Sequence, residues 1–315
     1  MGVLNSLKTT VCAAVLVGAM ALPALADDAI KLAVVTHGQS SDTYWTVVKK
    51  GVDDAAKLMG VDVTYEAPQT TDMVAEARMI DAAVAQKVQG LVVSIPDADA
   101  LDKSVKAAVD AGIPVIVIDS GEDEVPKVGA KFFVGTTSYF EQGARAAKQL
   151  MAAGVTKGVC ANHEAGNLVN ESACDGFIKT FGANGDRVEV SLDPTDTAAR
   201  MKAYLSAHPD VTGILALGAP SAANIVAGLR SAGILSKYKI GNFDVSSDTL
   251  EPLSKNEILF SFDSQQYMMG YLPIVMLTLN AKYGLLPINN IYTGPNPVTA
   301  NDVSKIQELS KKGIR

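Results

Sequence analysis

Residues 34–45 (VVTHGQSSDTYW) place a carboxylate and two large rings directly after an apolar, strand-like run. The carboxylate is Asp42, and the rings are Tyr44 and Trp45, the only Trp in the chain. A carboxylate accepts hydrogen bonds from hydroxyl groups, and an aromatic ring packs against apolar C–H groups. Together they suit a ligand with several hydroxyl groups on a carbon ring. The same residue types also fit a helix N-cap at Asp42 and a hydrophobic core around Trp45.

Further polar residues follow the other strand-like runs. In an open parallel sheet, ligands bind beyond the carboxyl ends of the strands, so residues at these points are candidate contacts. Besides Asp42, Tyr44 and Trp45, the predicted ligand-binding residues are Asp119, Ser120, Asn162, Glu164, Asp196, Gly218, Asp244, Asp263 and Gln265. His37, His163 and Asn167 follow strands as well, and they are not among the predicted ligand-binding residues. Carboxylates and amides at one edge favour a neutral, polyhydroxylated ligand, although each acid also fits a solvated loop or helix residue.

The chain lacks the motifs of several enzyme classes. It contains no G-x-G-x-x-G, no P-loop, no G-x-S-x-G and no pair of His with metal-ligand spacing. Two of the aspartates could still act as an acid and a base, as in a glycosidase. We therefore expect a binding protein without a cofactor, with an exported glycosidase as the alternative.

Strand-like and helix-like segments alternate, which is typical of a doubly wound α/β fold. Apolar runs at 31–37, 61–67, 90–95 and 114–120 alternate with helical periodicity at 44–60, 71–86 and 97–112. A second series has strands near 132–136, 158–164, 187–192, 211–218, 238–246 and 260–263. Helices separate the first five of these strands, and a long helix with an apolar face follows the last. Because no Pro/Ser-rich linker separates the two series, the sequence predicts two similar, tightly joined α/β lobes.

The chain of 315 residues is 48% hydrophobic and 19% charged, and its formal net charge is -7. This composition is that of an ordinary globular protein. The negative charge argues against nucleic-acid binding, which needs a basic surface to neutralise phosphates.

The N-terminal segment has the pattern of an export signal. Lys8 is the only charge before Asp27, and an apolar run ends in Ala-Leu-Ala at Ala26. We predict cleavage after Ala26, which makes 1–26 a signal peptide; the alternative is an N-terminal membrane anchor. An exported chain would then work in the periplasm.

Cys160 and Cys174 are the cysteines that remain after such a cleavage. Two cysteines in an oxidising compartment can form a disulfide. Two buried thiols are the alternative, because the sequence does not give the distance between them.

Several segments resemble periplasmic solute-binding proteins of the ribose/galactose type, which serve ABC sugar importers. They are DTYWTVVKKGV (42–52), VQGLVVSIPDADAL (88–101), AAVDAGIPVIVIDSG (107–121), AHPDVTGILALG (207–218) and IGNFDVS (240–246). The resemblance covers essentially the whole chain after the signal. It implies the type I periplasmic binding protein fold: two Rossmann-like lobes with parallel sheets, joined by a three-segment hinge. The N-terminal lobe would comprise 27–134 and 264–292, and the C-terminal lobe 135–263 and 293–315.

The resemblance also assigns roles to residues. Asp42, Tyr44 and Trp45 match ligand contacts after the first strand. Asp119 and Ser120 match an Asp-Arg pair that grips sugar hydroxyls. Asp244 matches the Asp of a G-F-D turn, and the region from Asp263 to Gln265 matches a Gln contact near the last crossover.

Three positions depart from the ribose-binding pattern. Ser120 and Ala173 stand where ribose binders have arginines, and Gly218 stands where they have an Asn. Without those arginines the cleft is acidic, so a sugar acid would lack a cationic partner. A neutral hexose, a pentose or a polyol fits such a cleft, and an amino sugar is a further option.

The predicted function is capture of a small sugar-like ligand between the lobes and its delivery to an ABC permease in the inner membrane, by a monomeric protein. One alternative is a receptor of the same fold for a furanosyl signal or a nucleoside. A sugar-responsive transcription regulator is opposed by the export signal and by the lack of an N-terminal helix-turn-helix.

Overall fold

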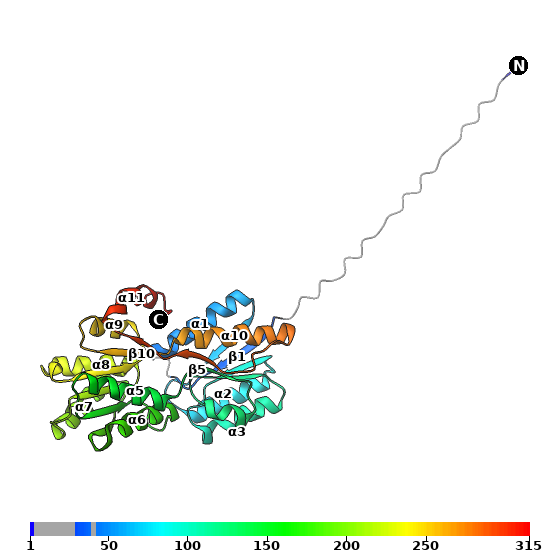
Figure 1. Cartoon of the computed structure of the whole chain (residues 1–315). Helices are drawn as coiled ribbons and strands as arrows, with labels where there is room; N and C mark the ends of the chain where they lie inside the picture. The colour runs from blue at the N-terminus through cyan, green and yellow to red at the C-terminus, as the bar shows by residue number, and fades with distance from the viewer. Residues whose placement is uncertain (3–28, 39–41) are drawn as a thin grey trace.

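A computed structural model describes residues 1–2, 29–38 and 42–315 of the chain. The described residues form two α/β lobes, each built on a sheet of six strands (Figure 1). The predicted export signal and its cleavage point after Ala26 lie outside the described residues.

The sheet of the N-terminal lobe has the strand order β11-β5-β4-β3-β1-β2, and all its pairings are parallel. Its strands are β1 (Lys31–Val35), β2 (Asp62–Glu66), β3 (Gly90–Val93), β4 (Val115–Ile118), β5 (Phe133–Thr136) and β11 (Ile291–Gly294). The side chains of β3, β4 and β5 are buried throughout, because helices cover both faces of the sheet.

The sheet of the C-terminal lobe repeats this arrangement, with the order β12-β10-β9-β8-β6-β7. Its strands are β6 (Gly158–Asn162), β7 (Gly185–Glu189), β8 (Gly213–Ala216), β9 (Lys239–Phe243), β10 (Phe260–Asp263) and β12 (Asn296–Val298). Only the short strand β12 runs antiparallel to its neighbour in the described sheet. By position, β4 of the first sheet corresponds to β9 of the second.

Helices cover each sheet on two sides (Figure 1). They are α1 (Thr43–Met59), α2 (Met73–Ala85), α3 (Ala98–Asp110), α4 (Val125–Val128), α5 (Tyr139–Ala152), α6 (Leu168–Phe181), α7 (Pro194–Ala207), α8 (Ala219–Ser231), α9 (Ser247–Ser254), α10 (Gln266–Tyr283) and α11 (Val303–Ser310). In the N-terminal lobe α1 and α10 pack together on one face, and α2 and α3 on the other. The predicted alternation of strands and helices in two Rossmann-like lobes is confirmed.

The chain passes between the two sheets at three places. These are the segments between β5 and α5, between β10 and α10, and between β11 and β12. The predicted boundary at 263 falls on the second crossing. Because β5 runs to Thr136 and β11 runs to Gly294, the other two crossings lie after the predicted lobe ends at 134 and 292.

A disulfide joins Cys160 on β6 to Cys174 on α6, with an Sγ–Sγ distance of 2.06 Å. Both residues are fully buried in the core between α5, α6 and the sheet. The bridge closes a short loop, since the residues are 14 positions apart. Cross-linking a loop of about 15 residues removes chain entropy from the unfolded state and is worth about 3 kcal/mol.

We therefore expect replacement of both cysteines by alanine to lower the free energy of unfolding by about 2–4 kcal/mol. The measurement is urea unfolding followed by circular dichroism. Wild-type protein treated with reductant in denaturant should show the same lowered midpoint. A midpoint that neither the variant nor the reductant changes would contradict a stabilising bridge.

Candidate ligand-binding site

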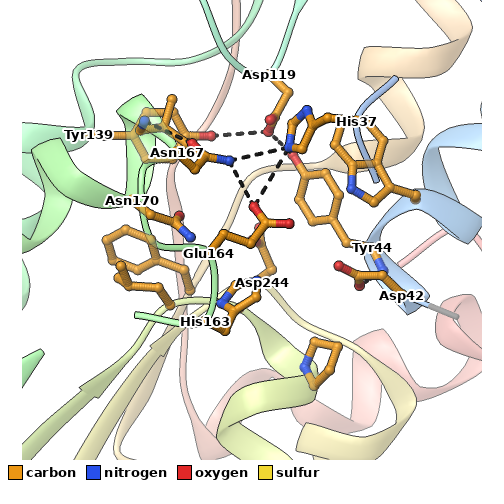
Figure 2. A pocket seen from close by; sticks show the side chains of 16 residues that line it. His37, Asp42, Tyr44, Asp119, Tyr139, His163, Glu164, Asn167, Asn170 and Asp244 are labelled. Carbon is orange, nitrogen blue, oxygen red and sulfur yellow. Dashed lines mark hydrogen bonds and ion pairs between the residues drawn. The ribbon is translucent and has the colours of Figure 1, made fainter. Parts of the chain in front are cut away.

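A cavity of about 50 Å³ lies between the lobes, where the carboxyl ends of both sheets face each other (Figure 2). It is lined by His37, Asp42, Tyr44, Trp45, Asp119, Tyr139, His163, Glu164, Asn167, Val169, Asn170, Leu217, Gly218, Pro220, Phe243 and Asp244. A single water needs ~10–15 Å³ of cavity volume measured in the same way. The cavity is therefore narrow but larger than a single water. Its lining is supplied by both lobes, so a ligand held there would touch both.

Asp119 and Asp244 occupy corresponding places in the two lobes. Asp119 directly follows β4, and Asp244 directly follows β9. Both have left-handed backbone conformations, with φ of 63° and 66°. This conformation is uncommon for residues other than Gly, although Asp tolerates it better than most. At both residues this conformation ends the strand and turns the carboxylate into the cavity.

The carboxylate of Asp119 is held by hydroxyl donors. The Tyr44 hydroxyl and the Tyr139 hydroxyl, the latter at 3.3 Å, donate to Oδ1. The Ser120 hydroxyl donates to Oδ2 at 2.7 Å. Burial and the nearby Asp119 carboxylate raise the pKa of both tyrosines well above the usual value, so they stay protonated donors. Tyr139 begins α5 of the C-terminal lobe, so this cluster joins the two lobes.

Asp244 is held from the other side of the cavity. Its Oδ1 accepts hydrogen bonds from the backbone N–H and the hydroxyl of Ser264. Its backbone carbonyl accepts from Asn242 at 2.8 Å and from Ser261 at 2.6 Å, which fixes the turn. Burial raises the pKa of Asp244 to about 7, with a further contribution from the negative charge of Asp119 and against the opposing bonds of Ser264.

Asp42 lies at the start of α1, beside the cavity. It is the N-cap of α1, with Oδ1 accepting from the backbone N–H of Tyr44 at 2.9 Å, and it also lines the cavity. Burial raises the pKa of its carboxyl above the usual value, against the influence of the nearby His163.

Three lining side chains form a polar bridge between the lobes, visible in Figure 2. Asn167 donates through Nδ2 to Glu164 Oε2 at 2.8 Å and lies 3.3 Å from His37 Nε2. His37 belongs to the N-terminal lobe, and Asn167 and Glu164 belong to the C-terminal lobe. A backbone bond from Leu168 N to Pro96 O, at 3.0 Å, joins the lobes beside this bridge. The described conformation is therefore a closed one.

Aromatic rings supply the apolar part of the lining. Trp45 packs edge-on against Tyr44, at 5.0 Å between ring centroids, and against His37, at 4.8 Å. Trp45 is also part of the hydrophobic core, and Phe243 lines the cavity from the C-terminal lobe. The rings can face the C–H groups of a ligand while the carboxylates take its hydroxyls.

The structure brings seven of the predicted residues to the cavity and places the others elsewhere. The seven are Asp42, Tyr44, Trp45, Asp119, Glu164, Gly218 and Asp244. Ser120 is buried behind Asp119, and Asn162 is buried below the loop that carries Glu164, whose N–H it accepts at 2.9 Å. Both position a lining residue without lining the cavity.

Three more predicted residues lie away from the cavity. Asp196 is on the surface, where it pairs with Arg200 at 2.8 Å within α7. Asp263 is buried at the crossing after β10 and pairs with the guanidinium of Arg315. Gln265 caps α10 and donates to the Thr293 carbonyl. We therefore leave these three out of the proposed ligand contacts.

Ala173 also lies away from the cavity, in the buried contact between α5 and α6. The residues of α6 that reach the cavity are Val169 and Asn170, which lie about one turn earlier on the helix. The correspondence of Ala173 with a ligand-binding arginine is therefore not supported by its position.

The sequence reasoning assigned no contact to several lining residues. His37, His163 and Asn167 were among the polar residues that follow strands, and Tyr139 follows β5 in the same way. The rule that selected Asp42 and Asp119 could have selected Tyr139 too.

Gly218 has no room for a side chain. Its φ is 107°, and an added Cβ would lie 2.9 Å from Cε1 of His163. We expect Gly218→Asn to weaken ligand binding by about tenfold or more, because the backbone is strained and the cavity loses space. Calorimetric titration measures this, with Gly233→Asn, a left-handed position with open space around it, as the control. Unchanged affinity in the Gly218 variant would show that the ligand does not approach this wall.

No helix in residues 29–38 and 42–315 is long and apolar enough to cross a membrane. Within the same ranges, no group of three or more His, Cys, Asp or Glu side chains could hold a metal ion.

The sequence is similar to those of known binding proteins. A sequence profile of the periplasmic binding protein domain matches residues 32–284. The xylose/arabinose-binding protein XylF of Sulfolobus acidocaldarius is 23% identical over 87% of this chain and 72% of its own length. A D-ribose/D-allose-binding protein of Pseudomonas aeruginosa is 28% identical over 59% of this chain and 60% of its own length.

Solved structures show the same fold. A carbohydrate transporter of Acidothermus cellulolyticus 11B, in complex with myo-inositol, has a TM-score of 0.85 and is 29% identical, covering 91% of this chain and 100% of that chain. A solute-binding protein of Burkholderia graminis in complex with D-arabinose has a TM-score of 0.79 at 21% identity, over 87% of this chain and 96% of that chain. The chain therefore belongs to the periplasmic binding protein domain family, among the solute-binding proteins of sugar ABC transporters.

Proposed function

We propose that this protein captures a small polyhydroxylated ligand, a monosaccharide or a cyclic polyol, between its lobes and delivers it to an ABC permease. The observation that carries the proposal is the lining of the inter-lobe cavity. Buried carboxylates and amides stand opposite aromatic rings there, and none of the described lining residues is Lys or Arg. Such a lining accepts hydrogen bonds from hydroxyls and packs on C–H faces, and it offers no partner to a sugar acid.

The names of the related proteins support the same ligand class. The relatives above are named for xylose, arabinose, ribose or allose, and two solved structures hold myo-inositol and D-arabinose. A cyclic polyol has hydroxyls around a whole ring, as a cavity with acceptors on both lobes requires.

Binding would proceed by hinge closure. The three crossing segments connect the lobes, and the contacts of Tyr139 with Asp119 and of Asn167 with His37 form when the lobes meet. A ligand that touches both lobes stabilises this closed state. The permease would then recognise the closed form.

The proposal includes the setting in which the protein works. The chain is exported and cleaved after Ala26, and it acts in the periplasm as a monomer. Membership of a family of exported binding proteins supports this part of the proposal. N-terminal sequencing of the mature protein tests the cleavage point.

The first test is a thermal-shift screen of the mature protein, followed by calorimetric titration of each hit. The screen contains myo-inositol, D-ribose, D-allose, D-xylose, L-arabinose, D-glucose, sugar acids and nucleosides. A ligand at about 100 times its Kd stabilises the native state by about 2.7 kcal/mol, which is a clear shift. We expect a hit among the neutral sugars or cyclic polyols, recovered unchanged after incubation.

Other outcomes have different meanings. A hit only among nucleosides or sugar acids would overturn the proposed ligand class, and consumption of the ligand would indicate a glycosidase.

A further inference from the structure

The inter-lobe cavity has more carboxylate side chains than a neutral ligand needs as acceptors. Four carboxylates line it: Asp42, Asp119, Glu164 and Asp244. Asp42, Asp119 and Asp244 are at most 8% exposed, and the side chain of Glu164 is 8% exposed. Among the described lining residues, the only side chains that could carry positive charge are His37 and His163. Several buried carboxylates without cations repel one another strongly in a medium of low dielectric constant.

The hydrogen bonds of His37 fit a neutral imidazole. The Asn167 amide is oriented by its bonds, because its Nδ2 donates to Glu164 and its Oδ1 accepts from Val169 N at 3.0 Å. The same Nδ2 lies 3.3 Å from His37 Nε2, which must therefore accept. The other ring nitrogen, Nδ1, then donates to the Ser94 hydroxyl at 2.8 Å. A ring nitrogen that accepts carries no proton, and the carboxylate oxygen in ion-pair range of it is Glu164 Oε2 at 3.7 Å, so His37 faces Glu164 and leaves Asp244 without a cation.

His163 does not pair with a carboxylate either. Its Nδ1 is buried and has no hydrogen-bond partner among the described residues. On Asp244, no described residue donates to Oδ2, although the residue is only 8% exposed and lines the cavity. Burial raises the pKa of both Asp42 and Asp244, and neighbouring carboxylates add to this, although the nearby His163 opposes it at Asp42; the fold therefore disfavours both charges. A positive group between them would relieve this cost.

A second, larger cavity of about 410 Å³ adjoins the first and shares Asp119, Tyr139 and Val169 with it. Its lining adds three consecutive acids, Glu122, Asp123 and Glu124. The one cation in its described lining, Lys127, is paired with Glu124 at 2.8 Å. An acidic cavity next to the site raises the local concentration of cations and repels anions.

We propose that the natural ligand carries a protonated amino group, as in an amino sugar or an aminocyclitol, and that this group binds between Asp42 and Asp244. This inference rests on the proposed function, because the hydroxyls of the same ligand would use the remaining acceptors. The ammonium donates to the free oxygen of Asp244, and the rings of Tyr44 and Trp45 favour a cation near their faces.

The experiment compares matched ligands by calorimetric titration near neutral pH. The pairs are myo-inositol with its mono-amino analogue, and D-glucose with D-glucosamine. Hydrogen bonds to charged groups are stronger than neutral ones, so we expect the amine of at least one pair to bind about tenfold more tightly. The advantage should shrink at high salt, because part of it is electrostatic steering from the acidic cavity.

The results separate this inference from the proposed function. If the neutral parents bind as tightly as the amines or more tightly, the inference is overturned and the proposed function stands. If neither member of any pair binds, and no neutral sugar or polyol binds, the proposed function fails as well. Asp244→Asn exchanges an acceptor for a donor, so it should weaken the amine about tenfold more than the parent alcohol. Equal weakening of both would overturn the placement of the amino group.

Discussion

Asp244→Asn is expected to stabilise the ligand-free protein above about pH 7 by a few kcal/mol and to weaken ligand binding by about 100-fold. The two effects have one cause. Asp244 is buried among other carboxylates, which raises its pKa from 3.8 to about 7 in the folded protein. The fold disfavours a charge on Asp244, yet a ligand needs an acceptor at this place. Stability and function therefore oppose each other.

The pH dependence follows from this raised pKa. Between pH 3.8 and about 7 the folded state holds a proton on Asp244 that the unfolded state has lost. The free energy of unfolding therefore falls as the pH rises through this window, and the whole cost is present above it. Asparagine has no such titration and can keep its Oδ1 as the acceptor for Ser264. The stability difference between variant and wild type should thus be large near pH 8 and vanish near pH 4.

Urea unfolding at several pH values measures the difference. Asp81→Asn removes an exposed carboxylate from α2 and serves as the control for a simple change of net charge. Because Asp42 and Glu76 also have raised pKa values, only the difference between variant and wild type isolates Asp244. An Asp244→Asn protein that is less stable than wild type at every pH would contradict the prediction.

The fold was predictable because its strands are buried on both faces. The runs VIVI of β4 and GLVV of β3 are continuous and apolar, and helices with one apolar face separate them. Three later elements, α9, β11 and β12, were not predicted, and each has a weak local pattern. β12 contains Pro297, α9 contains Pro252, and β11 is short and partly exposed. These elements depend on tertiary contacts across the crossings more than on their own periodicity.

The site was predictable only in part. Placing candidates after strands selected Asp42, Asp119 and Asp244, because the carboxyl ends of parallel strands do gather at one edge. The same rule could not tell which side chains turn inward. Asn162 follows the rule and yet lies beneath the loop, and Asp196 lies on the first turn of an exposed helix. Sequence position does not give the direction of a side chain in a loop.

Contacts between the lobes were beyond the sequence altogether. Tyr139 reaches Asp119, and Asn167 reaches His37, only because the two sheets face each other with their carboxyl ends together. The spacing of residues along the chain does not encode this contact between the lobes. Its clearest consequence is the set of hydroxyl groups that gather around Asp119.

Asp119→Ala is expected to lower both ligand affinity and stability, and the two losses should be separable. The substitution removes an acceptor from the cavity. The three hydroxyls that donate to this acceptor, those of Tyr44, Tyr139 and Ser120, then lose it as a partner. An unpaired buried polar group costs about 1–3 kcal/mol, so the stability loss should reach several kcal/mol unless water enters. Alanine is also strained at a φ of 63°.

Two further variants separate these causes. Asp119→Asn tolerates the left-handed backbone and keeps one acceptor, so it should recover most of the stability. Adding Tyr44→Phe and Tyr139→Phe to Asp119→Ala removes two of the orphaned hydroxyls, and it should recover about 2 kcal/mol or more. Urea unfolding measures both recoveries.

Ligand binding should not recover with stability. In the triple variant the cavity has lost a carboxylate and two hydroxyls that stand around the ligand, and the contact between Tyr139 and Asp119 that helps to hold the lobes closed. Each hydrogen bond to a charged group is worth about 1.5–3 kcal/mol, so affinity should stay at least about 100-fold below wild type. If affinity returned together with stability, Asp119 would support the fold alone and the ligand would be held by other residues. Stable folding with lost binding would instead assign to Asp119 the task of joining both lobes to the ligand.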